Sequence, residues 1–188
     1  MSKIAGTASR AFNLDLGSPE LGGVADVLAA VTDDGTEQTI TSGFTQPPTP
    51  RVITASSAGN EADIKAIQVT VNGTDEFDEP LTELLPIVTV NTATTVTGLK
   101  VFKTITSVVI PAHDGNGATT SFGLGDILGL GVLLTRNTVL TTFLGDVREA
   151  TLPTVKFSAS AIESNSILLD STLDGSAVLV DYYEPSPV

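Results

Sequence analysis

The sequence predicts an all-β fold: an antiparallel β-sandwich or barrel-like domain with an extended N-terminal arm. Of its 188 residues, 27 are Thr, 19 are Val and 11 are Ile. These three types make up about 30% of the chain, and their β-branched side chains suit the pleated surface of a sheet. Short alternating segments separated by turn dipeptides are typical of antiparallel rather than parallel sheets.

Alternation is clearest in residues 66–72, where Ile67, Val69 and Val71 are separated by polar residues in the period-2 pattern of a half-buried strand. Residues 102–110 are apolar on both faces, as in a strand at the centre of a sandwich. The other predicted strands are residues 51–55, 83–90, 94–100, 118–122, 131–135, 138–144, 154–159, 166–169 and 177–183. Turn signals separate them at Asp34-Gly35, Asn72-Gly73, Asp114-Gly115, Asn116-Gly117, Gly145-Asp146 and Asp174-Gly175.

A Pro-rich segment at residues 45–50 divides the chain, because proline and the residues before it adopt extended backbone. We therefore expect an N-terminal arm at residues 1–48 and a β-sandwich domain at residues 49–188. Residues 24–31 form the one apolar run before the prolines, and they fit a short helix or a strand paired with residues 37–41. The first segment is either an arm that reaches a neighbouring subunit or a strand of the same domain on a rigid connector.

Charge and missing residue types exclude several classes of function. The chain has 22 acidic and 9 basic residues and a net charge of −13, which argues against a nucleic-acid-binding surface. It contains no Cys and a single His, His113, which excludes thiol nucleophiles, iron–sulfur clusters and most zinc sites. No apolar run approaches the roughly 18 residues of a membrane-spanning helix, and no signal-peptide core is present. We expect a soluble protein that is not exported.

No group of residues has the pattern of a catalytic site. His113 lies in a Gly-rich turn, where Asp114 is adjacent in sequence and no nucleophile is close, and we interpret it as a loop histidine. The acidic loop 75–79 has four carboxylates but lacks EF-hand spacing, which favours a solvated hairpin tip over a weak cation site. Residues 115–131 are Gly-rich but lack the Lys of a phosphate loop. We therefore expect no enzyme, and no catalytic, cofactor-binding or metal-binding residues.

Charged residues are few and unevenly distributed. They make up 16% of the chain, against about 25% in an average domain. Residues 86–140 form a charge-poor block with only five of them: Lys100, Lys103, Asp114, Asp126 and Arg136. Because charged residues are depleted in cores and at the centres of interfaces, this block is expected to be the domain core, an assembly contact or both.

Five segments in the middle of the chain form a recognisable pattern: Pro50 to Ala55, Ile67 to Asp75, the pair Thr82-Glu83, Gly98 to Val108 and Gly123 to Leu130. In these segments the chain resembles a family of tailed-bacteriophage structural proteins. Members of that family more often have a Gly in the turn after Gly-Thr-Asp, whereas this chain has Glu76-Phe77-Asp78-Glu79, which indicates a longer hairpin. The resemblance implies a virion protein of the capsid decoration or cement type.

Such a protein would bind the outside of the phage head after being made in the host cytoplasm. The expected partners are the major capsid protein and further copies of the chain, with a trimer as the first choice, and neither nucleic acid nor membrane is expected as a direct partner. The expected capsid or subunit contacts are Phe44, Pro47, Pro48, Phe102, Phe122, Leu124, Leu128 and Leu130. The alternatives are a tail-tube, connector or baseplate component, and a host-surface or carbohydrate-binding β-sandwich. The shortage of Trp and Tyr counts against the last one.

Overall fold

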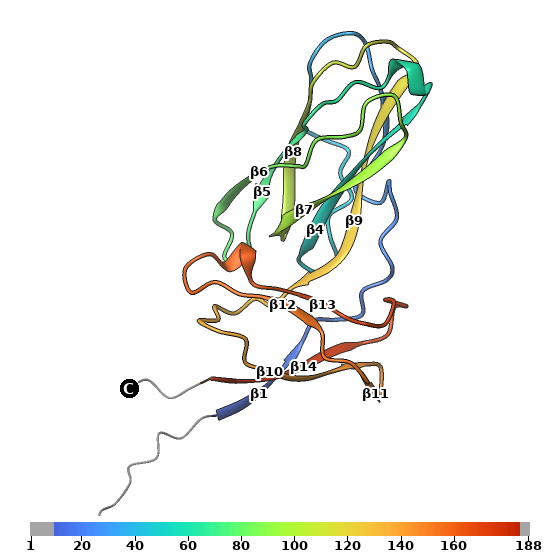
Figure 1. Ribbon diagram of the computed structural model, residues 1–188. Helices are drawn as coiled ribbons and strands as arrows, with labels where there is room; N and C mark the ends of the chain where they lie inside the picture. The colour runs from blue at the N-terminus through green and yellow to red at the C-terminus, as the bar shows by residue number, and fades with distance from the viewer. Residues whose placement is uncertain (1–9, 185–188) are drawn as a thin grey trace, which may run out of the picture.

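Residues 10–184, which the computed structural model describes, fold into antiparallel β-sheets (Figure 1), and the all-β prediction is confirmed. The strands are β1 (Arg10–Asp15), β2 (Leu28–Thr32), β3 (Gln38–Ile40), β4 (Arg51–Gly59), β5 (Thr70–Thr74), β6 (Pro80–Leu84), β7 (Thr94–Phe102), β8 (Thr104–Ile110), β9 (Ala118–Gly129), β10 (Val139–Leu144), β11 (Val147–Arg148), β12 (Thr154–Lys156), β13 (Ser166–Leu168) and β14 (Val178–Glu184). Two 3-10 turns, η1 (Glu61–Asp63) and η2 (Ile162–Ser164), interrupt the connections. No helix in this part of the chain is long and apolar enough to span a membrane.

Two of the sheets form a sandwich around the first core. One has the order β12-β13-β9-β4-β7, with β2 also paired to β9, and the other has the order β3-β8-β5-β6. Inward-facing side chains such as Ile53, Val71, Phe102, Val108 and Phe122 fill the space between them. All five are fully shielded from solvent, and each comes from a different strand, on the face that the alternation of side chains along a strand turns inward.

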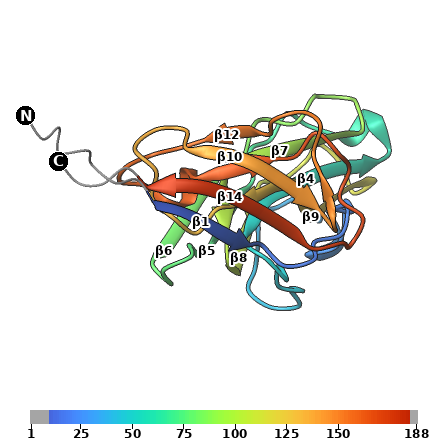
Figure 2. The same cartoon turned by 90° about the horizontal axis from the view of Figure 1, so that it is seen from below.

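The third sheet, β1-β14-β10-β11, lies across one end of the sandwich and encloses a second core (Figures 1 and 2). Leu128, Leu130, Ile167, Val178 and Val180 form its centre. The long strand β9 reaches both cores, since Phe122 packs in the first and Leu128 in the second. A break in register between β4 and β9, opposite Val52, marks a bulge in β9, and bulges bend a strand.

The extended N-terminal arm is not confirmed. Strand β1 pairs with β14, β2 with β9 and β3 with β8, so residues 10–48 contribute to all three sheets. Residues 28–32 are a strand, and the helix alternative is wrong; the pairing with residues 37–41 is also wrong, because β2 and β3 lie in different sheets. Residues 1–9 of the proposed arm and 185–188 of the proposed domain lie outside the described residues.

Most predicted strands are confirmed, and the exceptions have local causes. The strand predicted at residues 83–90 ends at Leu84, because Pro86 has no N–H to donate to a β-ladder. Leu85 and Val88 still donate their N–H groups to the carbonyls of Val69 and Ile67. Residues 131–135 are not a strand, since Gly131 at φ +64° turns the chain away after β9. Gly73 is not a turn residue but lies inside β5, where a Cβ would come 1.9 Å from the carbonyl oxygen of Thr104.

Candidate functional site: a pocket between the two cores

His113 has a structural position. Its Nδ1 accepts a hydrogen bond from the backbone N–H of Lys65 at 3.2 Å, so the neutral ring donates through Nε2 to the Thr120 hydroxyl, 3.0 Å away. Its own backbone N–H donates to Asp33. Burial lowers the pKa of His113, which favours this neutral form. Within residues 10–184 no group of three or more acidic, His or Cys side chains is arranged to hold a metal ion.

The acidic loop 75–79 connects β5 to β6, and its carboxylates do not converge. Asp75 is buried and accepts hydrogen bonds from the backbone N–H groups of Phe77 and Glu79. Asp78 points to solvent and pairs with Lys103, with 2.9 Å between Oδ1 and Nζ. Glu76 turns away from both, toward the interior. The hairpin is as expected, but its carboxylates have separate roles.

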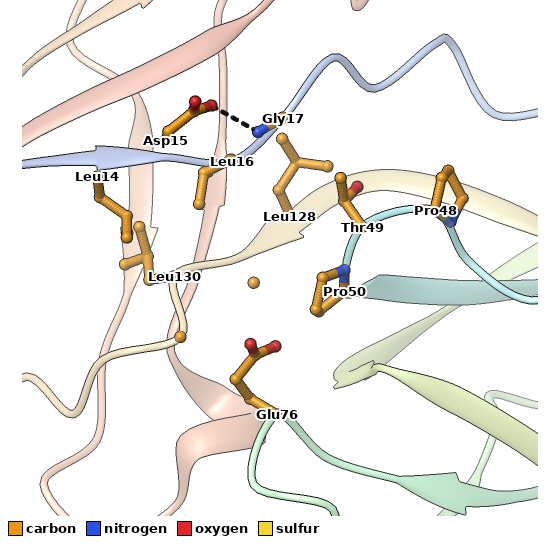
Figure 3. A pocket seen from close by; sticks show the side chains of 12 residues that line it. Leu14, Asp15, Leu16, Gly17, Pro48, Thr49, Pro50, Glu76, Leu128 and Leu130 are labelled. Carbon is orange, nitrogen blue, oxygen red and sulfur yellow. Dashed lines mark hydrogen bonds between the residues drawn. The ribbon is translucent and has the colours of Figure 1, made fainter.

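Glu76 lies at one end of a pocket of about 330 Å³ between the sandwich and the third sheet (Figure 3). Its lining residues come from β1 and the turn after it, from the Pro-rich connector, from the end of β9 and from the acidic loop: Leu14, Asp15, Leu16, Gly17, Pro48, Thr49, Pro50, Glu76, Leu128, Gly129, Leu130 and Gly131. The connector is fixed beside β9 by the Gly129 N–H, which donates to Pro50 O at 2.8 Å. Four segments far apart in the sequence therefore meet around one cavity.

Two polar atoms in this lining have no hydrogen-bond partner. They are Oε2 of Glu76 and Oγ1 of Thr49, and both are buried. Burial raises the pKa of the Glu76 carboxyl, and the nearby Lys103 opposes that shift. An unpaired buried oxygen costs about 1–3 kcal/mol. The pocket thus contains acceptors whose partners the described residues do not supply.

A second pocket, of about 520 Å³, lies on the other side of the Pro-rich connector and differs in this respect. Its charged lining residue Arg51 is 1% exposed and donates to Gly125 O at 2.6 Å, to Glu20 O at 3.0 Å and to Asp126 at 3.3 Å. Asp26 accepts from the Gly23 N–H. Arg51 and Asp26 are paired and Glu20 is exposed to solvent, so none of the residues that line this pocket has a buried polar atom without a partner.

The expected contact residues separate into three groups. Phe102, Phe122, Leu128 and Leu130 are at most 1% exposed and belong to the two cores, and Pro47 is also buried. Phe44 and Leu124 are half-buried against the first core, and Pro48 is exposed. The pocket brings together Pro48, Leu128 and Leu130, whereas the aromatic members lie in the sandwich. A buried side chain cannot contact a partner while the fold is intact.

Four apolar side chains that the sequence analysis did not single out are exposed on the edge strands β6 and β7 and on the connection between them. Leu84, Ile87, Val90 and Leu99 are 49–60% exposed. They lie on β6, on β7 or on the connection between them, and β6 and β7 are the outermost strands of their sheets. Glu83, next to Leu84 on β6, is 7% exposed and turns inward to accept the N–H of Leu99 at 2.6 Å. We call Leu84, Ile87, Val90 and Leu99 the β6–β7 apolar side.

In comparisons with known proteins, no family model, curated protein or solved structure matches this chain.

Proposed function

We propose that the protein is a structural protein of a phage virion, a decoration or cement protein that binds the outside of the head and stabilises contacts between capsomers. Its partner would be the major capsid protein, and it would act without a cofactor. The expectation comes from the resemblance of the middle of the chain to tailed-phage structural proteins, and the geometry adds a surface through which such a protein could attach.

The β6–β7 apolar side is the observation that carries this proposal. A chain with a net charge of −13 needs a contact surface without carboxylates if it is to pack closely on a partner, because burying an unpaired charge is costly. Residues 86–99 contain no charged side chain, and the acidic residue that precedes them in the sequence, Glu83, is turned inward onto backbone N–H groups. Interface cores are depleted of charge in the same way.

The two-core architecture supports a role in stabilisation. Strand β9 packs in both cores, and Arg51 joins β4, the β9 bulge and the segment at Glu20 through three hydrogen-bond partners. A body linked in this way resists bending between its two parts. Rigidity is what a protein needs if it is to hold neighbouring capsomers at a fixed spacing, since interfaces between preorganised surfaces cost less entropy to form.

Attachment to heads tests the proposal. The double variant Ile87→Glu/Leu99→Glu places two carboxylates on the β6–β7 apolar side, at positions 57% and 60% exposed, where the fold tolerates them. The matched control Val147→Glu/Leu152→Glu makes the same change at positions 70% and 66% exposed, on β11 and in the segment after it. We expect wild type and control to decorate expanded heads that lack the protein, and the test variant to lose occupancy in averaged electron micrographs.

Absence of bound density for the wild type at near-saturating concentration would refute head attachment. Equal occupancy of both double variants would refute the assignment of the contact to the β6–β7 apolar side. Assembly of the purified protein into rings or tubes without heads would instead favour the tail-tube alternative.

A further inference from the structure

The pocket between the two cores has apolar walls and a polar end. Leu14, Leu16, Leu128 and Leu130 line one part of it, and the rings of Pro48 and Pro50 line another. Figure 3 shows the Glu76 carboxylate pointing into the space bounded by Leu130 and Pro50. The cavity therefore fits a ligand with an aliphatic body and one polar end.

The charged residues of the pocket favour a cationic ligand. Its only charged lining residues are Asp15 and Glu76, both acidic. One carboxylate oxygen of Asp15, Oδ1, already accepts the Gly17 N–H at 2.8 Å. Lys103, the nearest cation, donates instead to the carboxylate of Asp78 and to the backbone oxygen of Glu76. Among the described residues, no salt bridge reaches the Glu76 carboxylate.

The hydrogen-bonding groups of the pocket distinguish among three kinds of ligand: a metal cation, an apolar molecule and an ammonium group. A hard divalent cation wants about six to eight oxygen ligands, which a pocket with four leucines and two prolines does not offer. A purely apolar ligand would leave Oε2 of Glu76 and Oγ1 of Thr49 unpaired. A primary ammonium group has three donors and no acceptor, and the methylene groups of a lysine stem pack well on apolar surface.

We propose that this pocket receives a lysine side chain of a partner protein, with the stem against the half-buried Leu14 and Leu16 and the ammonium group on Glu76. The occupant is protein-borne because a basic surface is what a chain of net charge −13 attracts. The pocket would serve this purpose whether or not the partner is a capsid protein.

Binding of small probes to the intact protein tests the inference. The probe is lysine blocked at both backbone ends, and blocked norleucine is the control that keeps the stem and lacks the ammonium group. Methyl resonances of the pocket leucines report binding. The variant Glu76→Gln removes the charge, and Glu79→Gln is the matched control, since Glu79 lies exposed in the same loop and does not line the pocket.

We expect saturable shifts of the pocket leucines with blocked lysine, weakened about tenfold by Glu76→Gln and not by Glu79→Gln, as for a lost charge-assisted bond. Blocked norleucine should bind at least about tenfold more weakly than blocked lysine. Equal binding of the two probes, equal effects of the two variants, or no saturable shift would overturn the inference. Tighter binding of putrescine than of blocked lysine, lost in Glu76→Gln, would assign the pocket to a free diamine and overturn the partner lysine.

Discussion

Replacing Asn165 by Asp changes one atom of a fully buried side chain and should destabilise the second core. Asn165 is 0% exposed, and its amide uses every hydrogen-bonding site. Oδ1 accepts the backbone N–H groups of Leu134 and Ser158, both at 3.0 Å. Nδ2 donates to Ser158 O at 2.9 Å and to Ala161 O at 2.8 Å. These two donors and two acceptors fix the orientation of the amide.

An aspartate keeps the two accepted bonds and loses both donated ones. The carbonyl of Ala161 still accepts the Ser164 N–H at 3.1 Å, so only the carbonyl of Ser158 is left unpaired, at a cost of about 2 kcal/mol. The ionised carboxylate adds a desolvation penalty, which the strengthened bonds from the two N–H groups partly offset. Once protonated, the side chain donates to the carbonyl of Ser158 again, and most of this loss is recovered.

The pH dependence follows from this difference. Burial beside two carbonyl oxygens raises the folded-state pKa of the introduced Asp above its unfolded value of about 3.9. The deficit of Asn165→Asp relative to wild type should therefore be smallest below about pH 4 and grow as the pH rises through the folded-state pKa.

Urea and thermal unfolding of wild type and variant across this range are the assays, and a fall in Tm of about 6 °C is expected at neutral pH. The control Asn137→Asp changes an exposed residue whose Oδ1 only accepts the Val139 N–H, so it should stay within about 0.5 kcal/mol of wild type. Equal stability of the two variants, or a deficit independent of pH, would refute the reasoning.

Three further predictions concern the fold. Because burial lowers the pKa of His113, its contribution to stability is present above its unfolded value of about 6.5 and lost as the pH falls through the folded value; thermal unfolding of wild type should show this step and His113→Gln should lack it. Burial raises the pKa of Glu83, so Glu83→Gln should gain stability over wild type as the pH rises from about 4.5 toward neutrality, and an unchanged difference in urea midpoint would contradict this. Deleting residues 1–48 removes β1, β2 and β3 and should abolish cooperative unfolding. An unchanged far-UV circular dichroism spectrum together with a cooperative thermal transition would show that these residues are dispensable.

Strand positions could be predicted where side chains alternate, but strand partners could not. Residues 94–100, 138–144 and 177–183 became β7, β10 and β14 with small shifts at their ends. Alternation records which face is buried and carries no information about the neighbouring strand. The pairing of β1 with β14, near opposite ends of the chain, therefore had no local signal.

Glycines misled the sequence analysis in β9. Only residues 118–122 were predicted to be a strand, because the glycines that follow are typical of turns. The strand continues to Gly129, and Gly123 is required there because a Cβ would lie 1.9 Å from the carbonyl oxygen of Gly23. The sequence does not distinguish a glycine that ends a strand from one that makes room for another backbone beside the strand.

The candidate site was predictable only in part. Pro48, Leu128 and Leu130 were singled out and do meet at the pocket, but the two leucines also belong to the second core. The acidic loop was noticed, yet which of its carboxylates turns inward depends on the hairpin turn. Asn165 lies in a polar Ser-Asn-Ser triplet that resembles a surface loop, and it is buried because its amide bonds the backbone of two other segments, at Leu134 and at residues 158–161.

The charge-poor block is explained by the position of its strands rather than by an interface alone. Residues 86–140 include β7, β8 and β9, and they contribute to the first core Phe102, Val108 and Phe122, all buried. Most of the missing charge is therefore the ordinary consequence of forming a core, because buried charges are costly. What core formation does not explain is the exposure of Ile87 and Leu99, at 57% and 60%. Under the proposed function, a contact with the capsid would account for this exposure.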